Sequence, residues 1–458
     1  MAEISATAFN FAIDIFEQLF YNNYTNICSI LECLMFSFLM KDLMNMRFIL
    51  HSDCNGFFAS VECLHNPEIR NKPVAVCGDA DKRHGIILAK NELAKKYKIQ
   101  TGEAVWQAKE KCPELVTVPP HYDRYLRFSK MATRIYSDYS DHIEPFGLDE
   151  AWIELTGSVT DFKQAENIAH EIRQRVKLEL GITVSVGVSF NKIFAKLGSD
   201  YKKPDAVTVI TPDNYKNVVH PLPSDCLLGV GKATRKKLLN IGVKTIGDIT
   251  HTPREILRSH LGKFGDTLYA FANGYDTSPV KPLGYSRLPK SIGNSTTPSR
   301  NMENLDDVKI VLGVLTDSVC RRAREQGLAA KTVTVNIRDE DLFIINRQLT
   351  LARHSNLTSE INAAALAVFD ENYQWRKPIR SIGVTLSDFV RDFAPVQTSL
   401  FVNEVKREQK TQLDKSLDSL KKRFGAFCVR PAFMLKDKEL SGFSPKEENI
   451  VHPVGYFG

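Results

Sequence analysis

Short apolar runs, each ending at a polar or glycine residue, recur through the first part of the chain. Residues 48–52 end at Asp53, residues 73–77 end at a glycine, and residues 86–89 form a third run. Short apolar runs between such turn signals are typical of buried strands. We therefore predict three strands here, and the first of them delivers a carboxylate at its tip.

Helical and strand patterns alternate in the residues between and after these runs. Apolar residues three or four apart predict helices over residues 57–64, 91–97, 123–140 and 161–180. A mostly apolar segment at residues 146–155 contains the adjacent acids Asp149 and Glu150, and residues 183–188 are strongly β-branched. Both segments are predicted strands. Strands that alternate with helices and carry acids at their tips indicate an α+β domain with a ferredoxin-like sheet.

The pattern becomes helical at residues 221–273, with two turns marked by glycine. A short helix, the turn at Gly229 and Gly231, and a second helix beginning at Lys232 suggest a helix-hairpin-helix. The amides of such a turn and the N-terminus of the second helix can hold a phosphate of the DNA backbone. The alternative is an ordinary pair of helices with a solvated basic face.

A linker with proline and glycine covers residues 277–286, and a mixed αβ pattern follows to residue 388. Apolar and polar residues alternate at residues 331–338 and 379–386, which predicts strands with one solvated face. Beyond Asp392 the chain is polar and has little strand signal apart from residues 397–401. We therefore expect a second αβ domain followed by a polar tail.

The composition limits the classes of protein that fit these patterns. A length of 458 residues exceeds one ordinary core, so several domains are expected. Hydrophobic residues make up 43% and charged residues 25%, as in soluble globular proteins. The net charge of +6 permits a polyanionic partner without demanding one. The nine cysteines have neither paired nor zinc-ligand spacing, which argues for a reducing compartment and against structural zinc.

The first 45 residues differ from the rest of the chain. They are rich in Phe, Ile, Leu and Met and poor in Lys and Arg. No basic segment precedes the apolar part, as it would in a signal peptide, and the most apolar piece is too short to span a bilayer. We interpret residues 1–46 as an extension outside the catalytic fold. The alternative is an amphipathic helix that docks on a partner or a membrane.

The adjacent acids Asp149 and Glu150 carry the most chemical information. Their side chains diverge on a strand, but near its tip both can reach one metal cluster together with Asp53 from a neighbouring strand. Carboxylate oxygens are ligands that Mg2+ prefers. Two such ions, about 3.5–4 Å apart, stabilise the attacking and leaving oxygens of a phosphoryl displacement. An acid pair alone is more often a solvated turn, so this prediction depends on the motifs around it.

Four motifs occur in order along the chain. They are DCNGFFASVE at residues 53–62, GLDEA at 147–151, VGVSFNKIFAKL at 186–197 and SDYKKP at 199–204. Together they resemble the Y-family DNA polymerases, most closely the DNA polymerase IV branch, over about residues 47–402. The resemblance implies template-directed synthesis past damaged bases by a cytoplasmic enzyme of low fidelity without proofreading.

The resemblance also implies a division of the chain into parts. It places a palm with small fingers at residues 47–220, or to 232 with its edge. A helix-hairpin-helix thumb follows at residues 221–280, and an αβ little finger at residues 286–390. Residues 391–458 are then a tail that contains a clamp-binding peptide, and residues 1–46 stay outside the catalytic fold.

Three acids and one backbone group match the metal site of the family. Asp53, Asp149 and Glu150 match its catalytic carboxylates, and the backbone carbonyl of Cys54 would complete the shell of one ion. The resemblance implies two Mg2+ ions as cofactors. It also implies a primer–template DNA and an incoming dNTP as partners of this site.

Other positions match the surroundings of the incoming nucleotide. Phe58, five residues after the first acid, matches the aromatic steric gate that excludes a ribose 2′-hydroxyl, although core packing is the alternative for this residue alone. Lys203 matches the lysine that holds the triphosphate. The chain departs from the family where Glu92 and Lys95 replace the usual Tyr and Arg, so Lys95 keeps a charge but no bidentate fork. Asn55 replaces a second acid.

The peptide QTSLF at residues 397–401 resembles the segment by which these bacterial polymerases bind a sliding clamp. Gln397 would form hydrogen bonds, while Leu400 and Phe401 would fill an apolar pocket. We therefore predict a monomeric polymerase that binds the clamp and does not bind membranes. Two alternatives are a catalytically weak, clamp-bound accessory protein of mutagenic repair and an enzyme similar to nucleotide cyclases.

Overall fold

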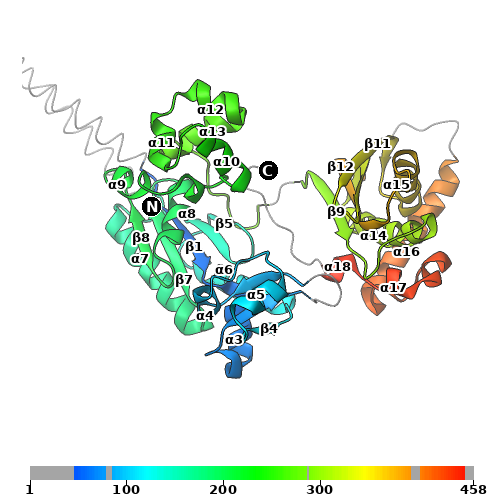
Figure 1. Ribbon diagram of the computed structural model, residues 1–458, viewed down its shortest axis with the longest axis horizontal. Coiled ribbons are helices and arrows are strands. Elements are labelled where there is room, and N and C mark those ends of the chain that lie inside the picture. Colours follow the sequence, from blue (N-terminus) through cyan, green and yellow to red (C-terminus); the bar gives the residue numbers. More distant parts are fainter. Residues whose placement is uncertain (1–45, 79–84, 286–287, 394–402, 449–458) are drawn as a thin grey trace, which may run out of the picture.

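The computed structural model describes residues 46–78, 85–285, 288–393 and 403–448. These residues form two lobes on either side of the linker near residue 285 (Figure 1). The first lobe holds a five-stranded sheet, a three-stranded sheet and a group of short helices. The second lobe is built on a four-stranded sheet.

The five-stranded sheet carries both predicted acid sites. Its strand order is β5-β6-β1-β7-β8, and all neighbours are antiparallel except β7 and β8. The central strand β1 is buried along its whole length, as its apolar sequence predicts. The strands are β1 (Ile49–Cys54), β5 (Ile143–Pro145), β6 (Glu150–Glu154), β7 (Val184–Ser189) and β8 (Val207–Ile210).

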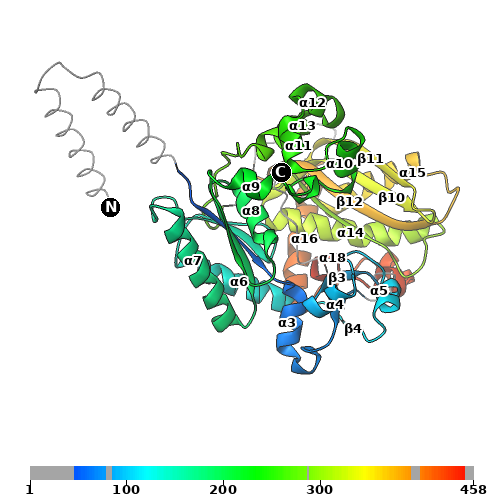
Figure 2. The same ribbon diagram turned by 60° about the vertical axis from the view of Figure 1, so that its left-hand side comes forward.

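Helices cover both faces of this sheet (Figure 2). Helices α3 (Phe57–His65), α6 (Tyr122–Ser137) and α7 (Phe162–Arg175) share an apolar core with one face. Helix α8 (Lys192–Tyr201) packs on the other face. It comes so close that a Cβ atom at Gly187 of β7 would lie 1.9 Å from the carbonyl oxygen of Ala195. Only glycine fits there, and this contact fixes α8 beside the acid-bearing strands.

Two predicted elements of this lobe differ from the observed ones. Residues 146–155, predicted as one strand, form a turn followed by β6. The turn begins at Gly147, whose φ of +97° is accessible to glycine at little cost. The helix predicted over residues 161–180 is regular only as far as Arg175, where α7 ends. A π-helical turn, Val176–Leu180, follows it directly.

The three-stranded sheet has the order β3-β2-β4 and a small apolar core of its own. Its strands are β2 (Val74–Cys77), β3 (Ile87–Lys90) and β4 (Val116–Val118), and its helices are α4 (Glu92–Lys96) and α5 (Val105–Lys111). This unit corresponds to the small fingers expected from the sequence.

The helical region follows the five-stranded sheet and packs on α8. Its core includes Ile193 and Phe194 of α8 together with apolar residues of the short helices. These helices are α9 (Tyr215–Val219), α10 (Lys232–Asn240), α11 (Ile246–His251), α12 (Arg254–Leu261) and α13 (Lys263–Ala272). The 3-10 helix Ser224–Cys226 precedes the predicted glycine turn, so the first helix of the expected hairpin is only this short.

The second lobe has the element order strand, helix, strand, strand, helix, strand. The sheet order is β11-β10-β12-β9, fully antiparallel, with the second and fourth strands of the lobe in the centre. Its helices share the core with one face of the sheet. The elements are β9 (Ser291–Thr296), α14 (Leu305–Glu325), β10 (Leu328–Asp339), β11 (Ile344–Ser355), α15 (Thr358–Asn372) and β12 (Ile379–Arg391).

The residues expected to form a polar tail instead fold back on this lobe. Helix α16 (Glu404–Phe424) and the short helices α17 (Lys438–Ser441) and α18 (Pro445–Glu448) lie against α14 and α15. The buried Arg324 of α14 forms ion pairs with Asp414 and Asp418 of α16. Because the docking uses ion pairs, the segment has a polar composition that resembles a solvated tail.

Candidate active site

The register of the central strands brings the three predicted acids to one end of the sheet. Asp53 on β1 stands directly opposite Glu150 on β6. The backbone N–H of Cys54 donates to the carbonyl oxygen of Asp149 at 2.9 Å, which places the second acid beside the same strand end. Residues almost a hundred positions apart are therefore joined by backbone pairing, as the sequence predicts.

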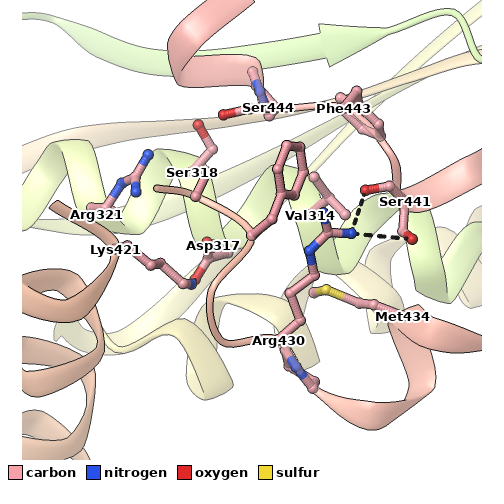
Figure 3. A pocket seen from close by; sticks show the side chains of 14 residues that line it. Val314, Asp317, Ser318, Arg321, Lys421, Arg430, Met434, Ser441, Phe443 and Ser444 are labelled. Atoms are coloured by element: carbon pink, nitrogen blue, oxygen red, sulfur yellow. Dashed lines mark hydrogen bonds and ion pairs between the residues drawn. The ribbon is translucent and has the colours of Figure 1, made fainter. Parts of the chain in front are cut away.

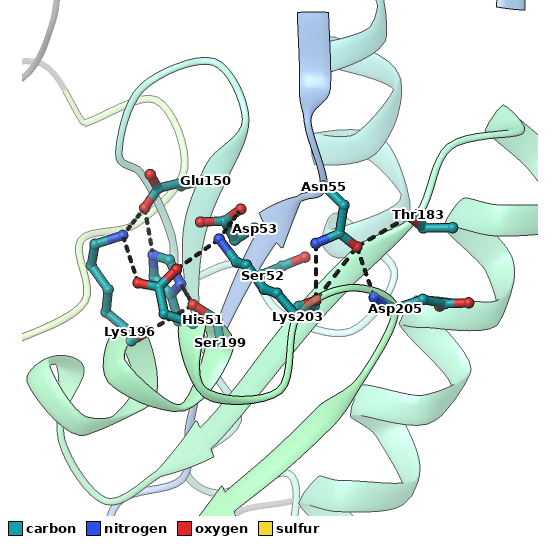
Figure 4. Close-up of polar contacts among 12 residues, drawn as sticks. His51, Ser52, Asp53, Asn55, Glu150, Thr183, Lys196, Ser199, Lys203 and Asp205 are labelled. Carbon is teal, nitrogen blue, oxygen red and sulfur yellow. Dashed lines mark hydrogen bonds and ion pairs between the residues drawn. The ribbon is translucent and has the colours of Figure 1, made fainter. Parts of the chain in front are cut away.

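The carboxylate of Glu150 is held by two cationic or polar neighbours (Figure 4). His51 Nε2 lies 3.2 Å from its Oε2, and the ammonium group of Lys196 on α8 contacts the same oxygen. Burial would raise the pKa of Glu150, but His51 and Lys196 outweigh it and lower the pKa to about 2. Glu150 is therefore ionised and fixed in place.

His51 is itself fixed inside the protein. Its side chain is fully buried, its Nδ1 lies 2.9 Å from the hydroxyl of Ser199, and its ring packs edge-on against Trp152. Burial, followed by the nearby charge of Lys196, lowers the pKa of His51 to about 4. His51 is therefore a neutral imidazole that contacts the carboxylate of Glu150 from inside the protein.

The other two acids are in a different electrostatic state. Burial is the largest cause that raises the pKa of Asp53 to about 7, with Lys203 opposing it and the charge of Glu150 adding to it. Burial and then repulsion from Glu150 raise the pKa of Asp149 to about 6. Asp53 is buried and Asp149 is half-buried, and the surroundings of both carboxylates lack sufficient positive charge.

The chemistry of these acids suits a divalent cation, although their side chains point in different directions. Hard carboxylate oxygens suit Mg2+, and a cation would relieve the repulsion that raises two of the pKa values. Within the described ranges no three acidic, imidazole or thiol groups converge on one point. Glu150 is turned toward Lys196, and Asp53 toward Lys203. The three-carboxylate site and the carbonyl ligand from Cys54 stay predictions.

Lys203 lies directly beside the acids. Its Nζ is 2.7 Å from Asp53 Oδ1 and 2.7 Å from Asp200 Oδ1. Burial would lower the pKa of Lys203, but the two carboxylates outweigh it and raise the pKa. Lys203 is therefore a fully charged ammonium at the mouth of the site, which is the state required to bind a triphosphate.

Phe58, the predicted steric gate, follows the end of β1 by four residues and Asp53 by five. It lies in the first turn of α3 and is half-buried. Its ring stacks on Tyr125, with ring centroids 4.1 Å apart and planes 8° apart. Tyr125 is anchored by a 2.7 Å hydrogen bond to Glu62. Phe58 is thus both packed and partly exposed, so its role as a gate stays a prediction.

The other sequence-predicted contacts are distributed over the molecule. Glu92 and Lys95 pair with each other on α4 at 2.5 Å, which leaves the ammonium group of Lys95 engaged by an acid. Gly229 has a φ of +90°, and Gly231 caps the N-terminus of α10 with open space around it, where the side chain of Lys232 is exposed. The predicted clamp peptide with Gln397, Leu400 and Phe401 lies outside the described residues.

His51 and Lys196 are site residues that the sequence analysis did not single out. His51 is the one basic residue in an apolar strand and lies two positions before Asp53, hence on the same face of β1. Lys196 lies one helical turn before Asp200 on α8. Two signals could have identified these residues. His51 is a polar residue in a buried strand, and Lys196 has helical spacing to Asp200.

Family models match most of the described chain. The impB/mucB/samB family matches residues 52–200, its C-terminal domain matches residues 289–400, and the DNA polymerase-iota thumb domain matches residues 225–276. The DNA polymerase IV of Acetivibrio thermocellus is 50% identical over 395 residues, which cover 86% of this chain and 99% of that protein. The chain belongs to the Y-family DNA polymerases.

Other members of the Y family support this assignment. The DNA polymerase IV 2 of Bacillus subtilis is 35% identical over 84% of this chain and 94% of its own length. A solved Y-family chimera of Dbh and Dpo4 covers 75% of this chain and 99% of its own length, with 25% identity and a TM-score of 0.66. The DinB structure from Sulfolobus solfataricus gives 26% identity and a TM-score of 0.52, over 74% of this chain and 98% of its own.

Membership in the Y family confirms the expected fold class and enzyme class, a multidomain α+β DNA-directed DNA polymerase of the DNA polymerase IV branch. The five-stranded sheet is its palm, the helical region its thumb, and the four-stranded sheet its little finger. Y-family polymerases use divalent metal ions, in keeping with the oxygen-rich site. No helix of the described ranges is long and apolar enough to cross a membrane.

Proposed function

We propose that this polymerase extends a primer 3′ end with deoxynucleotides opposite damaged template bases, with low fidelity and without excising its errors. The observation that carries the proposal is that backbone pairing brings Asp53, Asp149 and Glu150 to one end of the sheet, with Lys203 beside Asp53. This arrangement suits phosphoryl transfer and little else. The described elements are all accounted for by palm, fingers, thumb, little finger and the docked C-terminal segment, so none is left to form an exonuclease.

In this proposal the three carboxylates hold two Mg2+ ions. When bound, those ions supply electrostatic stabilisation of the attacking and leaving oxygens in the transfer of a nucleotidyl group. Glu150 is already ionised and oriented by Lys196. Asp53 would exchange its contact with Lys203 for a contact with a cation.

That exchange gives Lys203 its part in the reaction. With Asp53 held by a cation, Lys203 would keep Asp200 as its partner, and its other N–H donors would be available to the oxygens of the triphosphate. Phe58, held by its stack on Tyr125, would meet the sugar and exclude a 2′-hydroxyl. The partners proposed for this site are a primer–template and a dNTP. A monomeric, cytoplasmic enzyme that also binds a sliding clamp completes the proposal.

Primer extension on templates with and without an abasic site tests the proposal. The variant Asp149→Ala should extend primers on both templates at a rate lower by roughly a thousandfold or more, because an electrostatic contribution that stabilises the transition state is removed. Binding of primer–template, measured by fluorescence anisotropy, should persist because backbone contacts dominate it. Asp213→Ala changes an exposed acid and should keep full activity.

Two outcomes would contradict different parts of the proposal. Extension by Asp149→Ala at a tenth of the parent rate would remove this acid from the reaction. A parent enzyme that copies undamaged DNA but stops at the abasic site would leave a polymerase without the proposed bypass function.

A further inference from the structure

A pocket lies between the little-finger helix α14 and the docked C-terminal segment, far along the chain from the polymerase acids (Figure 3). Residues of α14 form one wall, and residues of α16 and of the chain from 426 to 445 form the other. Its internal volume is about 30 Å³. On the usual scale that is room for one or two water molecules, or for one small anion, and far too little for a nucleotide.

The side chain of Arg321 in this pocket is buried without a partner. Arg321 is only 6% exposed, and its Nε has no hydrogen-bond acceptor. Among the described residues the guanidinium forms neither a hydrogen bond nor an ion pair. Arg324, one turn further along α14, is equally buried but has two carboxylate partners. A buried guanidinium normally requires such a counter-charge.

Further positive charge surrounds the same pocket. Lys421 of α16 lines it and pairs with Asp317 at 2.6 Å. Arg430 lines it too, donates to the carbonyl oxygen of Ser441 at 2.8 Å and lies over the ring of Phe427 at 3.9 Å. Three cationic side chains thus face one acid, Asp317, which is already paired. The lining carries an excess of two positive charges.

We propose that this pocket binds a small tetrahedral oxyanion, with inorganic phosphate as its simplest form. Guanidinium groups present paired N–H donors that match phosphate oxygens, and Arg321 and Arg430 reach the pocket from opposite walls. The hydroxyl groups of Ser318 and Ser441 add polar lining. The anion supplies the counter-charge that the buried Arg321 otherwise lacks.

The anion would act as a bridge between two parts of the chain. Arg321 belongs to the little finger, whereas Lys421 and Arg430 belong to the C-terminal segment. An oxyanion bound by both neutralises repulsion across the contact and holds the segment in place. Occupancy of the pocket therefore sets how firmly residues 403–448 dock on the little finger.

Thermal melting of the full chain tests the site. Phosphate is added to the parent at constant ionic strength, with chloride as the exchanged anion, so that general screening is unchanged. We expect a saturable rise in melting temperature of a few degrees, on top of the linear rise that a kosmotropic anion gives any protein. Arg321→Met should lose the saturable part and keep the linear part. Lys422→Gln, an exposed neighbour on α16, should respond like the parent.

Arg321→Met should fold, because it replaces a buried charge that has no partner by an apolar chain of similar length. An equal phosphate response in the parent and in Arg321→Met would overturn the proposal. A second measurement needs no variant: crystals of the parent grown with tungstate should show an anomalous peak within hydrogen-bond distance of Arg321. Peaks confined to exposed cations would also overturn it. Neither readout involves polymerase activity, so its outcome is independent of the proposed function.

Discussion

The side-chain oxygen of Asn55 accepts a hydrogen bond from the backbone N–H of Asp205 at 2.9 Å. The same oxygen accepts from the hydroxyl of Thr183 at 3.1 Å, and the amide group donates to Ser185 at 2.9 Å. This buried amide joins the end of β1 to the loop that follows α8. That loop carries Lys203, the lysine proposed to bind the triphosphate, so the position of Lys203 depends on Asn55.

We expect Asn55→Ala to raise the KM for dNTP about tenfold with a smaller change in kcat, because several buried hydrogen bonds that place Lys203 are lost. Asn55→Asp should have a KM close to that of the parent, since a carboxylate accepts the same N–H and hydroxyl donors. Steady-state extension with each variant measures both constants. A stable Asn55→Ala enzyme with the parent KM would show that the loop holds its position without this residue.

The stack of Phe58 on Tyr125 leads to a prediction about sugar selection. Phe58→Ala should raise the ratio of ribonucleotide to deoxynucleotide incorporation by a factor of about a hundred or more, because steric exclusion of the 2′-hydroxyl is lost. Tyr125→Ala should raise the ratio less, since it only loosens the support.

The matched control for the gate is Tyr125→Phe. It keeps the stacked ring and removes only the hydrogen bond to Glu62, so the parent ratio should be retained. The measurement compares specificity constants for paired nucleotides. If Phe58→Ala leaves the ratio unchanged and only lowers the melting temperature, Phe58 is a packing residue.

The start of β1 predicts where the catalytic fold begins. The guanidinium of Arg47 donates to both carboxylate oxygens of Glu154, at 2.9 and 3.1 Å, and to the carbonyl of Ser278 at 3.0 Å. A shortened chain that begins at Met46 should therefore melt and extend primers like the full chain. A chain that begins at Phe48 should melt several degrees lower, because Glu154 loses its cationic partner. Insolubility of the chain from Met46 would instead show that residues 1–45 pack on the fold.

The predicted clamp peptide is tested by Leu400→Ala with Phe401→Ala. The double variant should keep distributive synthesis and lose stimulation by a loaded clamp, because two apolar anchors contribute most of such contacts. Gln397→Ala alone should weaken stimulation less. Primer extension with and without clamp, beside a melting curve, separates the outcomes. Loss of both basal activity and thermal stability would place these residues in the core of the little finger.

The sequence predicts the palm well and parts of its site poorly, and the difference has a physical reason. The strand ending at Asp53 and the pair Asp149–Glu150 are readable because apolar runs mark buried strands and the acids interrupt them. The contacts of Glu150 with His51 and Lys196 cannot be predicted from the sequence, since they join residues far apart in the chain through side chains alone.

The C-terminal segment shows the same limit more strongly. Helix α16 has a polar sequence, and hydrophobic periodicity cannot distinguish a solvated helix from one docked through ion pairs. Its partner Arg324 lies about ninety residues earlier, so only the folded chain reveals that the charges meet. Composition therefore predicted a tail where the structure has a docked element.

This docking also decides where the polymerase can be cut for biochemical work. A protein truncated at residue 390 would keep the palm, the fingers, the thumb and all but the last residue of the final little-finger strand. The truncation would remove both carboxylate partners of Arg324. It would also expose the surface of α14 at Gly313, against which Phe433 and Met434 pack. Because the removed segment also covers Arg324, the truncation would expose this cation and the apolar surface of α14 to water and should lower the melting temperature. A stable minimal enzyme should therefore keep α16 and the segment with Phe433 and Met434, well past the last strand of the little finger.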